Sequence, residues 1–82
     1  MHLGNHLKRC RFEYDDMSQE ALAEAVGVTR QTILSIEKGR FVPSTLLSLK
    51  IARFFKKRVE DIFYIIDEFP EMKSERPFSN ER

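Results

Sequence analysis

The chain has 82 residues, a formal net charge of +1 and a hydrophobic fraction of 41%. A chain of this size supports one small hydrophobic core. Its single cysteine excludes an internal disulfide framework and fits a reducing compartment. No apolar run approaches the roughly 20 residues of a membrane span, and the first residues lack the layout of a secretory signal. We therefore expect a cytoplasmic protein.

Charge is distributed unevenly along the chain. Residues 1–58 hold eleven Lys and Arg against six Asp and Glu, a net charge of +5, whereas residues 59–82 hold three against seven, a net charge of −4. Binding to a polyanion depends on local potential rather than total charge, so the basic part is compatible with a phosphate-binding surface. The acidic part is interpreted as solvated sequence, and competition with phosphate is the alternative.

Five helices are predicted, at about residues 5–14, 19–26, 30–38, 45–55 and 60–63. Ser44 is the expected N-cap of the fourth. In the first, Cys10 is expected to be a small packing residue. His2 and His6 have a spacing that can bind a metal ion from one helix face, but no third ligand accompanies them. We therefore expect no metal site.

The second and third predicted helices are joined by a very short corner. Ser18 is a suitable N-cap for the second helix, and Gly27 is a suitable stop. Only Val28 separates this glycine from Thr29, the next N-cap, so the two helices must meet at a tight angle.

The third predicted helix has one apolar and one polar side. At about 100° per residue, one side holds Ile33, Ile36 and Glu37, and the opposite side holds Gln31, Ser35 and Lys38. Because the isoleucines face the core, the polar groups face outward. Two capped helices around a glycine corner are typical of the helix-turn-helix, a DNA-binding motif. An ordinary helical hairpin in a small bundle is the alternative, but it needs neither the short corner nor the polar outer face.

From Asn5 to Phe63 the sequence resembles the Cro/CI-type, or XRE, family of helix-turn-helix regulators. The runs MSQEALAEAVGVTRQTI and IEKGRFVPS carry the resemblance. It implies an all-α fold, a compact lambda-repressor-like domain of five helices at residues 1–63, followed by a C-terminal extension at residues 64–82. No cofactor is implied. Nor does the sequence bring together a nucleophile, a base and an orienting group, so we expect no enzyme activity.

The resemblance also assigns DNA contacts. It places the start of the third helix against DNA and gives Gln19 a phosphate contact at a helix N-terminus. Gln31 and Ser35 point away from the isoleucines and are the best candidates to read base edges, whereas Arg30 can read guanine or bind phosphate. The expected base contacts are Arg30, Gln31, Thr32 and Ser35, and the expected phosphate contacts are Gln19, Thr29, Lys38 and Arg40.

Glu37 is an acid on the core-facing side of the third helix and therefore needs a partner. The family pattern offers Arg11 in the first helix. A partly buried Arg11–Glu37 ion pair would orient the third helix against the first, although burying both charges is costly. The alternative is that both side chains are exposed.

Two positions depart from the family pattern. Thr45 and Leu46 reverse the usual order of an apolar and a polar residue, so the fourth helix is rotated in its first turn or uses Leu46 at an interface. The triplet Lys56 to Arg58 replaces a common glycine, which predicts a non-glycine residue in the left-handed conformation at a cost of about 1 kcal/mol. We interpret the triplet as a solvated charge run rather than a phosphate contact.

The apolar run IFYII at residues 62–66 is compatible with a strand or with the end of a helix. Because it extends a domain that is already complete, it predicts a homodimer that binds a palindromic operator. The expected interface residues are Ile62, Phe63, Tyr64, Ile65, Ile66 and Phe69. Residues 73–82 are expected to be disordered.

The favoured function is a sequence-specific transcriptional regulator, a repressor that occupies its operator. The alternative is an antitoxin-type interaction protein, whose segment from Tyr64 to Phe78 folds on a protein partner. RNA binding is a weaker third option because no aromatic stacking platform is visible. The expected partners are double-stranded DNA and a second copy of the chain, and no small-molecule ligand is evident.

Overall fold

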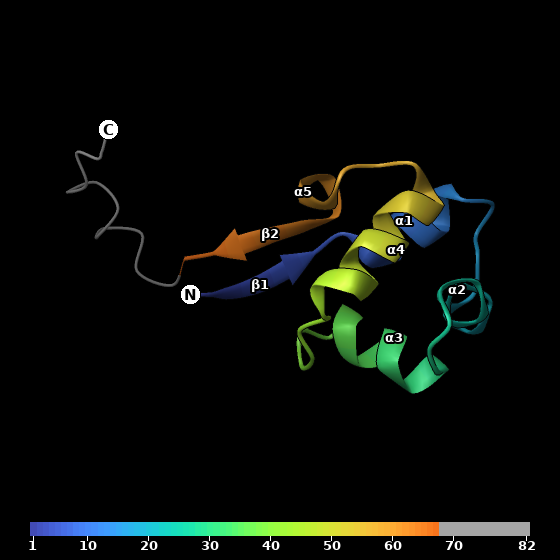
Figure 1. The fold of residues 1–82 in the computed structure, drawn as a ribbon, viewed down its shortest axis with the longest axis horizontal. Coiled ribbons are helices and arrows are strands. Elements are labelled where there is room, and N and C mark those ends of the chain that lie inside the picture. Colours follow the sequence, from blue (N-terminus) through green and yellow to red (C-terminus); the bar gives the residue numbers. More distant parts are fainter. Residues whose placement is uncertain (68–82) are drawn as a thin grey trace.

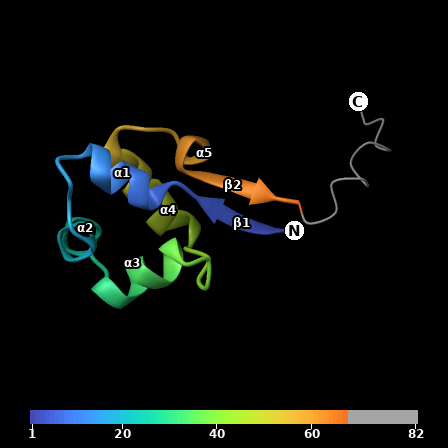
Figure 2. The ribbon, with the colours of Figure 1, turned by 180° about the vertical axis from the view of Figure 1, so that it is seen from behind.

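The computed structural model describes residues 1–67. In chain order these residues form β1 (His2–Asn5), α1 (Leu7–Glu13), α2 (Gln19–Val26), α3 (Arg30–Glu37), α4 (Thr45–Phe55), α5 (Val59–Ile62) and β2 (Phe63–Ile66) (Figure 1). Seen from behind, the two strands leave the helical bundle side by side at the end away from α2 (Figure 2). The predictions for Phe69, for disorder at residues 73–82 and for most of the segment from Tyr64 to Phe78 lie outside the described residues.

The predicted N-caps fix where three helices begin. Each cap oxygen accepts a hydrogen bond from a first-turn backbone N–H that would otherwise have no partner. The bonds are Ala21 N–H to Ser18 Oγ at 3.0 Å, Thr32 N–H to Thr29 Oγ1 at 3.2 Å and Leu47 N–H to Ser44 Oγ at 3.1 Å. The bounds predicted for α2 and α4 are confirmed, while α3 ends one residue earlier than predicted and α5 starts and ends one residue earlier.

Left-handed residues end α2 and α4. Gly27 has φ 79° at the end of α2, where a glycine avoids the steric penalty of a side chain. Lys56 has φ 58° at the end of α4. The predicted left-handed residue in the basic triplet is therefore confirmed.

The all-α prediction is wrong at both ends of the domain, where β1 and β2 pair antiparallel. Residues 5 and 6 are not helical, and Asn5 lies opposite Phe63 in the hairpin. Opposite Tyr64 stands Gly4, where an added Cβ would lie 2.5 Å from the tyrosine ring. Local patterns could not show this pairing because the two strands are distant in sequence. The expected domain boundary after residue 63 falls inside β2.

The core gathers side chains from every helix and from β2. It consists of Leu7, Cys10, Leu22, Ala23, Val26, Ile33, Ile36, Leu47, Ile51, Ala52, Phe55, Ile62 and Phe63. The prediction that Ile62 and Phe63 contribute to a dimer interface is wrong, because they are 0% and 6% exposed within their own chain. Tyr64 and Ile65, in contrast, are 41% and 67% exposed. Within residues 1–67, no helix is long and apolar enough to cross a membrane.

Candidate DNA-binding surface

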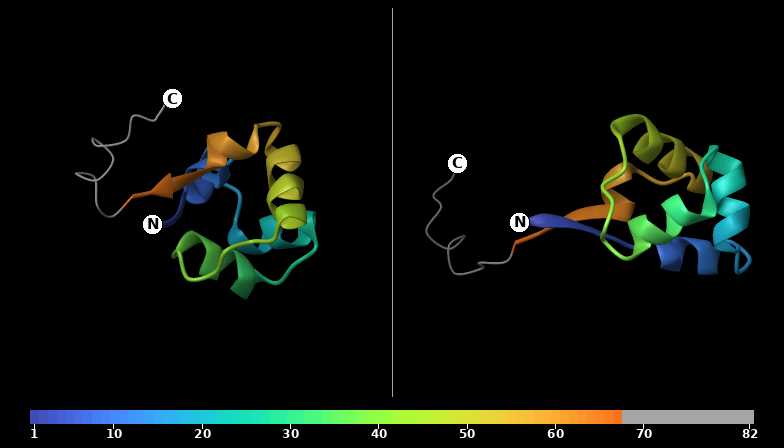
Figure 3. Two further views of the ribbon diagram at one scale, coloured as in Figure 1. Left: turned by 60° about the vertical axis from the view of Figure 1, so that its left-hand side comes forward. Right: turned by 90° about the horizontal axis from the view of Figure 1, so that it is seen from below.

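α3 lies at the surface of the bundle, in front when the molecule is viewed from below (Figure 3). Gln31 and Lys38 are exposed and Ser35 is half-buried. The amide Nε2 of Gln31 lies 3.5 Å from Ser35 Oγ, so these two side chains share one face of the helix. On the other side, Ile33 and Ile36 are buried in the core, which fixes the rotation of α3 about its axis.

The start of α3 is held by two threonines. Thr29 Oγ1 caps the helix and also lies 3.1 Å from Thr32 Oγ1. Both hydroxyls therefore have a partner within the protein, and each still has hydrogen-bonding capacity for another group. Arg30 is exposed between them. Base reading by Arg30 and Thr32, and phosphate binding by Thr29, stay predictions.

The Glu37 carboxylate joins three helices at the end of α3. Arg11 of α1 donates from Nε to Oε2 at 2.6 Å and from Nη2 to Oε1 at 3.1 Å. Gln19, the first residue of α2, donates from Nε2 to Oε1 at 3.0 Å. Arg11 also donates from Nη1 to the Met17 carbonyl at 2.7 Å. These charge-assisted bonds satisfy a pair of charges that would be costly to bury without partners.

The hydrogen bond from Gln19 bears on its predicted phosphate contact. The amide nitrogen has two hydrogens, of which Glu37 accepts one. The second hydrogen and the backbone at the start of α2 remain suited to an anion. Phosphate binding by Gln19 therefore stays a prediction, and the structure adds a contact that ties this end of α2 to the end of α3.

A tight turn follows Glu37 at the end of α3. Gly39 has φ 75°, and its N–H donates to the Ile36 carbonyl at 3.0 Å. The N–H of Arg40 donates to the Ser35 carbonyl at 2.9 Å. This pair of bonds is the Schellman motif, which satisfies the last carbonyls of a helix. Lys38 and Arg40, the predicted phosphate contacts, are exposed on this turn.

Sequence reasoning missed Asn5, which contacts the same turn. Its Nδ2 donates to the Ile36 carbonyl at 2.9 Å, and its Oδ1 accepts from the Leu7 N–H at 3.0 Å. The signal available was an asparagine two residues before the true start of α1, where its side chain can bond the backbone ahead of it. Placing Asn5 inside a helix hid that signal.

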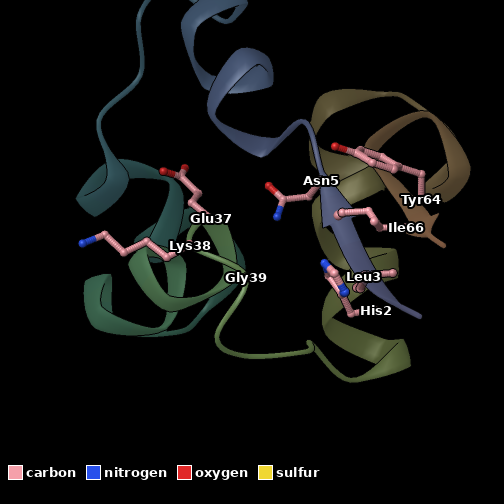
Figure 4. Close-up of a pocket in the computed structure, with 9 residues that line it drawn as sticks. His2, Leu3, Asn5, Glu37, Lys38, Gly39, Tyr64 and Ile66 are labelled. Carbon is pink, nitrogen blue, oxygen red and sulfur yellow. The ribbon is translucent and has the colours of Figure 1, made fainter. Parts of the chain in front are cut away.

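An open hollow of about 300 Å³ separates the hairpin from the end of α3 (Figure 4). It is lined by His2, Leu3, Gly4, Asn5, Glu37, Lys38, Gly39, Tyr64 and Ile66. His2 lies in β1 and His6 is the N-cap of α1, so they do not share a helix face. Within residues 1–67, no group of three or more potential metal ligands is close enough together to hold an ion.

Two remaining expectations concern the two ends of α4. Leu46 is 67% exposed, so it is available at the surface. The basic triplet Lys56 to Arg58 is also exposed. In it, Arg58 Nε lies 3.6 Å from Asp61 Oδ2. The triplet follows α4 rather than α3, and its interpretation as a solvated charge run stays a prediction.

Two capped helices in a tight corner, with a polar face on the second, define the helix-turn-helix class of DNA-binding domains. The helix-turn-helix family model matches residues 15–62. The chain is 55% identical over 60 residues to the uncharacterised HTH-type transcriptional regulator YgzD of Bacillus subtilis, covering 73% of this chain and 86% of that protein. Uncharacterised HTH-type transcriptional regulators of Methanocaldococcus jannaschii and Archaeoglobus fulgidus are 48% and 54% identical over 66 residues, which is 80% of this chain and 98% and 93% of theirs.

The chain therefore belongs to the XRE-type helix-turn-helix family of DNA-binding transcriptional regulators.

Proposed function

We propose that this protein is a sequence-specific transcriptional repressor that binds a palindromic operator as a homodimer. The observation that carries the proposal is the exposed polar face of α3, opposite the buried Ile33 and Ile36. Because the core fixes this helix in rotation, its polar side chains are presented in one orientation. Occupying an operator would then block access to the promoter.

Base reading is assigned first to Gln31 and Ser35. A glutamine amide can donate to and accept from the edge of adenine in the major groove. The neighbouring Ser35 Oγ lies 3.5 Å from Gln31 Nε2, so the two polar groups face the same side of α3. Arg30 and Thr32 extend the reading surface toward the start of α3. Around it, Gln19, Thr29, Lys38 and Arg40 bind phosphates, which position the domain without reading sequence.

The dimer is assigned to the exposed part of the hairpin. Ile65 is 67% exposed and Tyr64 is 41% exposed, although both belong to an apolar run. A two-stranded sheet also has strand edges that can pair with another chain. Tyr64, Ile65 and Ile66 remain the proposed interface residues within the described part of the chain. A two-fold dimer requires two half-sites about one helical turn apart.

Selection of bound duplexes from a random DNA pool tests this function. The expected product is one enriched motif with two-fold symmetry, bound at least about a thousandfold more tightly than random DNA at the same salt concentration. Enrichment of an asymmetric motif would contradict the proposal that a homodimer binds a palindromic operator. Recovery of random sequences would overturn sequence-specific binding itself.

A further inference from the structure

The last turn of α3 is held by a residue from outside the helix-turn-helix. The Ile36 carbonyl accepts hydrogen bonds from Asn5 Nδ2 at 2.9 Å and from Gly39 N–H at 3.0 Å. A carbonyl oxygen has two lone pairs, so it can accept from both donors at once. Asn5 thus bonds the same oxygen that closes the Schellman turn.

The Asn5 side chain is itself fixed from two directions. Its Oδ1 accepts from the Leu7 N–H at 3.0 Å, which leaves only its nitrogen to face Ile36. Its backbone lies in β1, opposite the buried Phe63 of β2. Because the amide cannot turn over without losing both bonds, the hairpin and the end of α3 have a fixed relative position.

The relative position of the hairpin and α3 determines the conformation of the turn that follows α3. Lys38 and Arg40 project from the turn that the Ile36 carbonyl closes, and Figure 4 shows Asn5 and Lys38 on opposite sides of the hollow at this turn. Arg11 anchors the same end of α3 independently through Glu37. Arg11 therefore holds the end of α3 through the Glu37 side chain, and Asn5 holds it through the Ile36 backbone carbonyl.

We propose that Asn5 is a positioning residue for specific DNA recognition, acting through the Ile36 carbonyl on the turn that carries Lys38 and Arg40. The inference rests on the proposed function of sequence-specific binding. Non-specific binding is electrostatic and tolerates shifts of a few cations, because phosphates are present all along the duplex. Specific binding needs the phosphate contacts in register with the base-reading face. Asn5 is therefore expected to affect specificity more than general affinity.

Asn5→Asp separates the two bonds of this side chain. The carboxylate still accepts from the Leu7 N–H but presents an oxygen, not a donor, to the Ile36 carbonyl. Asn5→Ala removes both bonds without adding charge. Phe12→Ala is the control, because Phe12 is 71% exposed on α1 and its change leaves both bonds of Asn5 intact.

The affinity of each variant is measured for the selected operator and for random duplexes, at a temperature where melting curves show all of them folded. Both Asn5 variants lack the bond to the Ile36 carbonyl, so both should lose about tenfold in affinity for the operator and less than about twofold for random DNA. Any repulsion between the new carboxylate and DNA acts on both ligands and cancels in the ratio. Phe12→Ala should keep the wild-type ratio.

Hydrogen exchange gives a readout that does not involve DNA. In Asn5→Asp the Gly39 and Arg40 amides should exchange about tenfold faster than in wild type, while amides in α2 and α4 keep their rates. An unchanged operator-to-random ratio, or unchanged exchange at Gly39 and Arg40, would overturn the role of Asn5. Failure of the proposed function would look different from failure of the Asn5 proposal. In that case the wild-type protein itself would show no sequence preference.

Discussion

Arg11 and Glu37, 26 residues apart in sequence, form a two-point ion pair with distances of 2.6 and 3.1 Å. Their side chains are only 13% and 8% exposed. The pair fixes the end of α3 against α1, and Gln19 extends the contact to the start of α2. The Glu37 carboxylate therefore links α3, which carries the proposed DNA surface, to both α1 and α2.

Removing one member of this pair should destabilise the protein strongly. Arg11→Met and Glu37→Gln should each lower the free energy of unfolding by about 3 kcal/mol, because the remaining partner is left buried without its counter-charge. Urea denaturation measures the loss. The double variant should lose less than the sum of the two.

Arg58→Gln is the control for the ion pair. Arg58 and Asp61 are 74% and 45% exposed, so this change should cost less than about 1 kcal/mol. If the Arg11 and Glu37 single variants melted like wild type, the structural role assigned to their pair would be wrong.

Lys56→Gly should stabilise the fold. Lys56 has φ 58°, a conformation that costs a residue with a side chain about 1 kcal/mol and costs glycine almost nothing. We expect a gain of about 0.5–1 kcal/mol in the free energy of unfolding, measured by urea denaturation. Lys57→Gly, one residue later and outside the left-handed region, should give no gain. Equal effects of the two variants would contradict the explanation.

Cys10 should be protected from thiol reagents in the folded protein. Burial raises the pKa of its thiol, with a smaller opposing effect from Lys57. The neutral thiol therefore persists to higher pH in the folded state, and the stability linked to it is lost as pH rises above the pKa of the unfolded thiol. At pH 8 a disulfide reagent should react much faster after denaturant is added. Equal rates with and without denaturant would show that the thiol is accessible.

Ile65→Lys should weaken the proposed dimer, because it places a charge in an apolar interface at a residue that is 67% exposed within one chain. Sedimentation at micromolar concentration should give a dimer for wild type and a monomer for the variant. Phe12→Lys is the matched control, since Phe12 is 71% exposed but lies on α1. A wild-type monomer, with and without DNA, would rule out the dimer.

The features that could be predicted from the sequence depend on residues close together in the chain. Ser18, Thr29 and Ser44 are caps that act within one turn, and the face of α3 follows from helical geometry. The hairpin was missed because Gly4 and Tyr64 are distant in sequence, and local patterns do not indicate their pairing. For the same reason no local signal showed that Asn5 bonds Ile36, although its bond to the Leu7 N–H had one. Nor could the burial of Phe63 be distinguished from exposure at an interface.

Comparison of Gln31→Ala with Lys38→Ala on the selected operator and on random DNA tests the central claim most directly. Gln31→Ala should lose about 1–3 kcal/mol of operator binding and relax one base position, with little loss on random DNA. Lys38→Ala should weaken both ligands alike and reduce the salt dependence. If each variant instead lost equal affinity for operator and random DNA, base reading by the polar face of α3 would be contradicted.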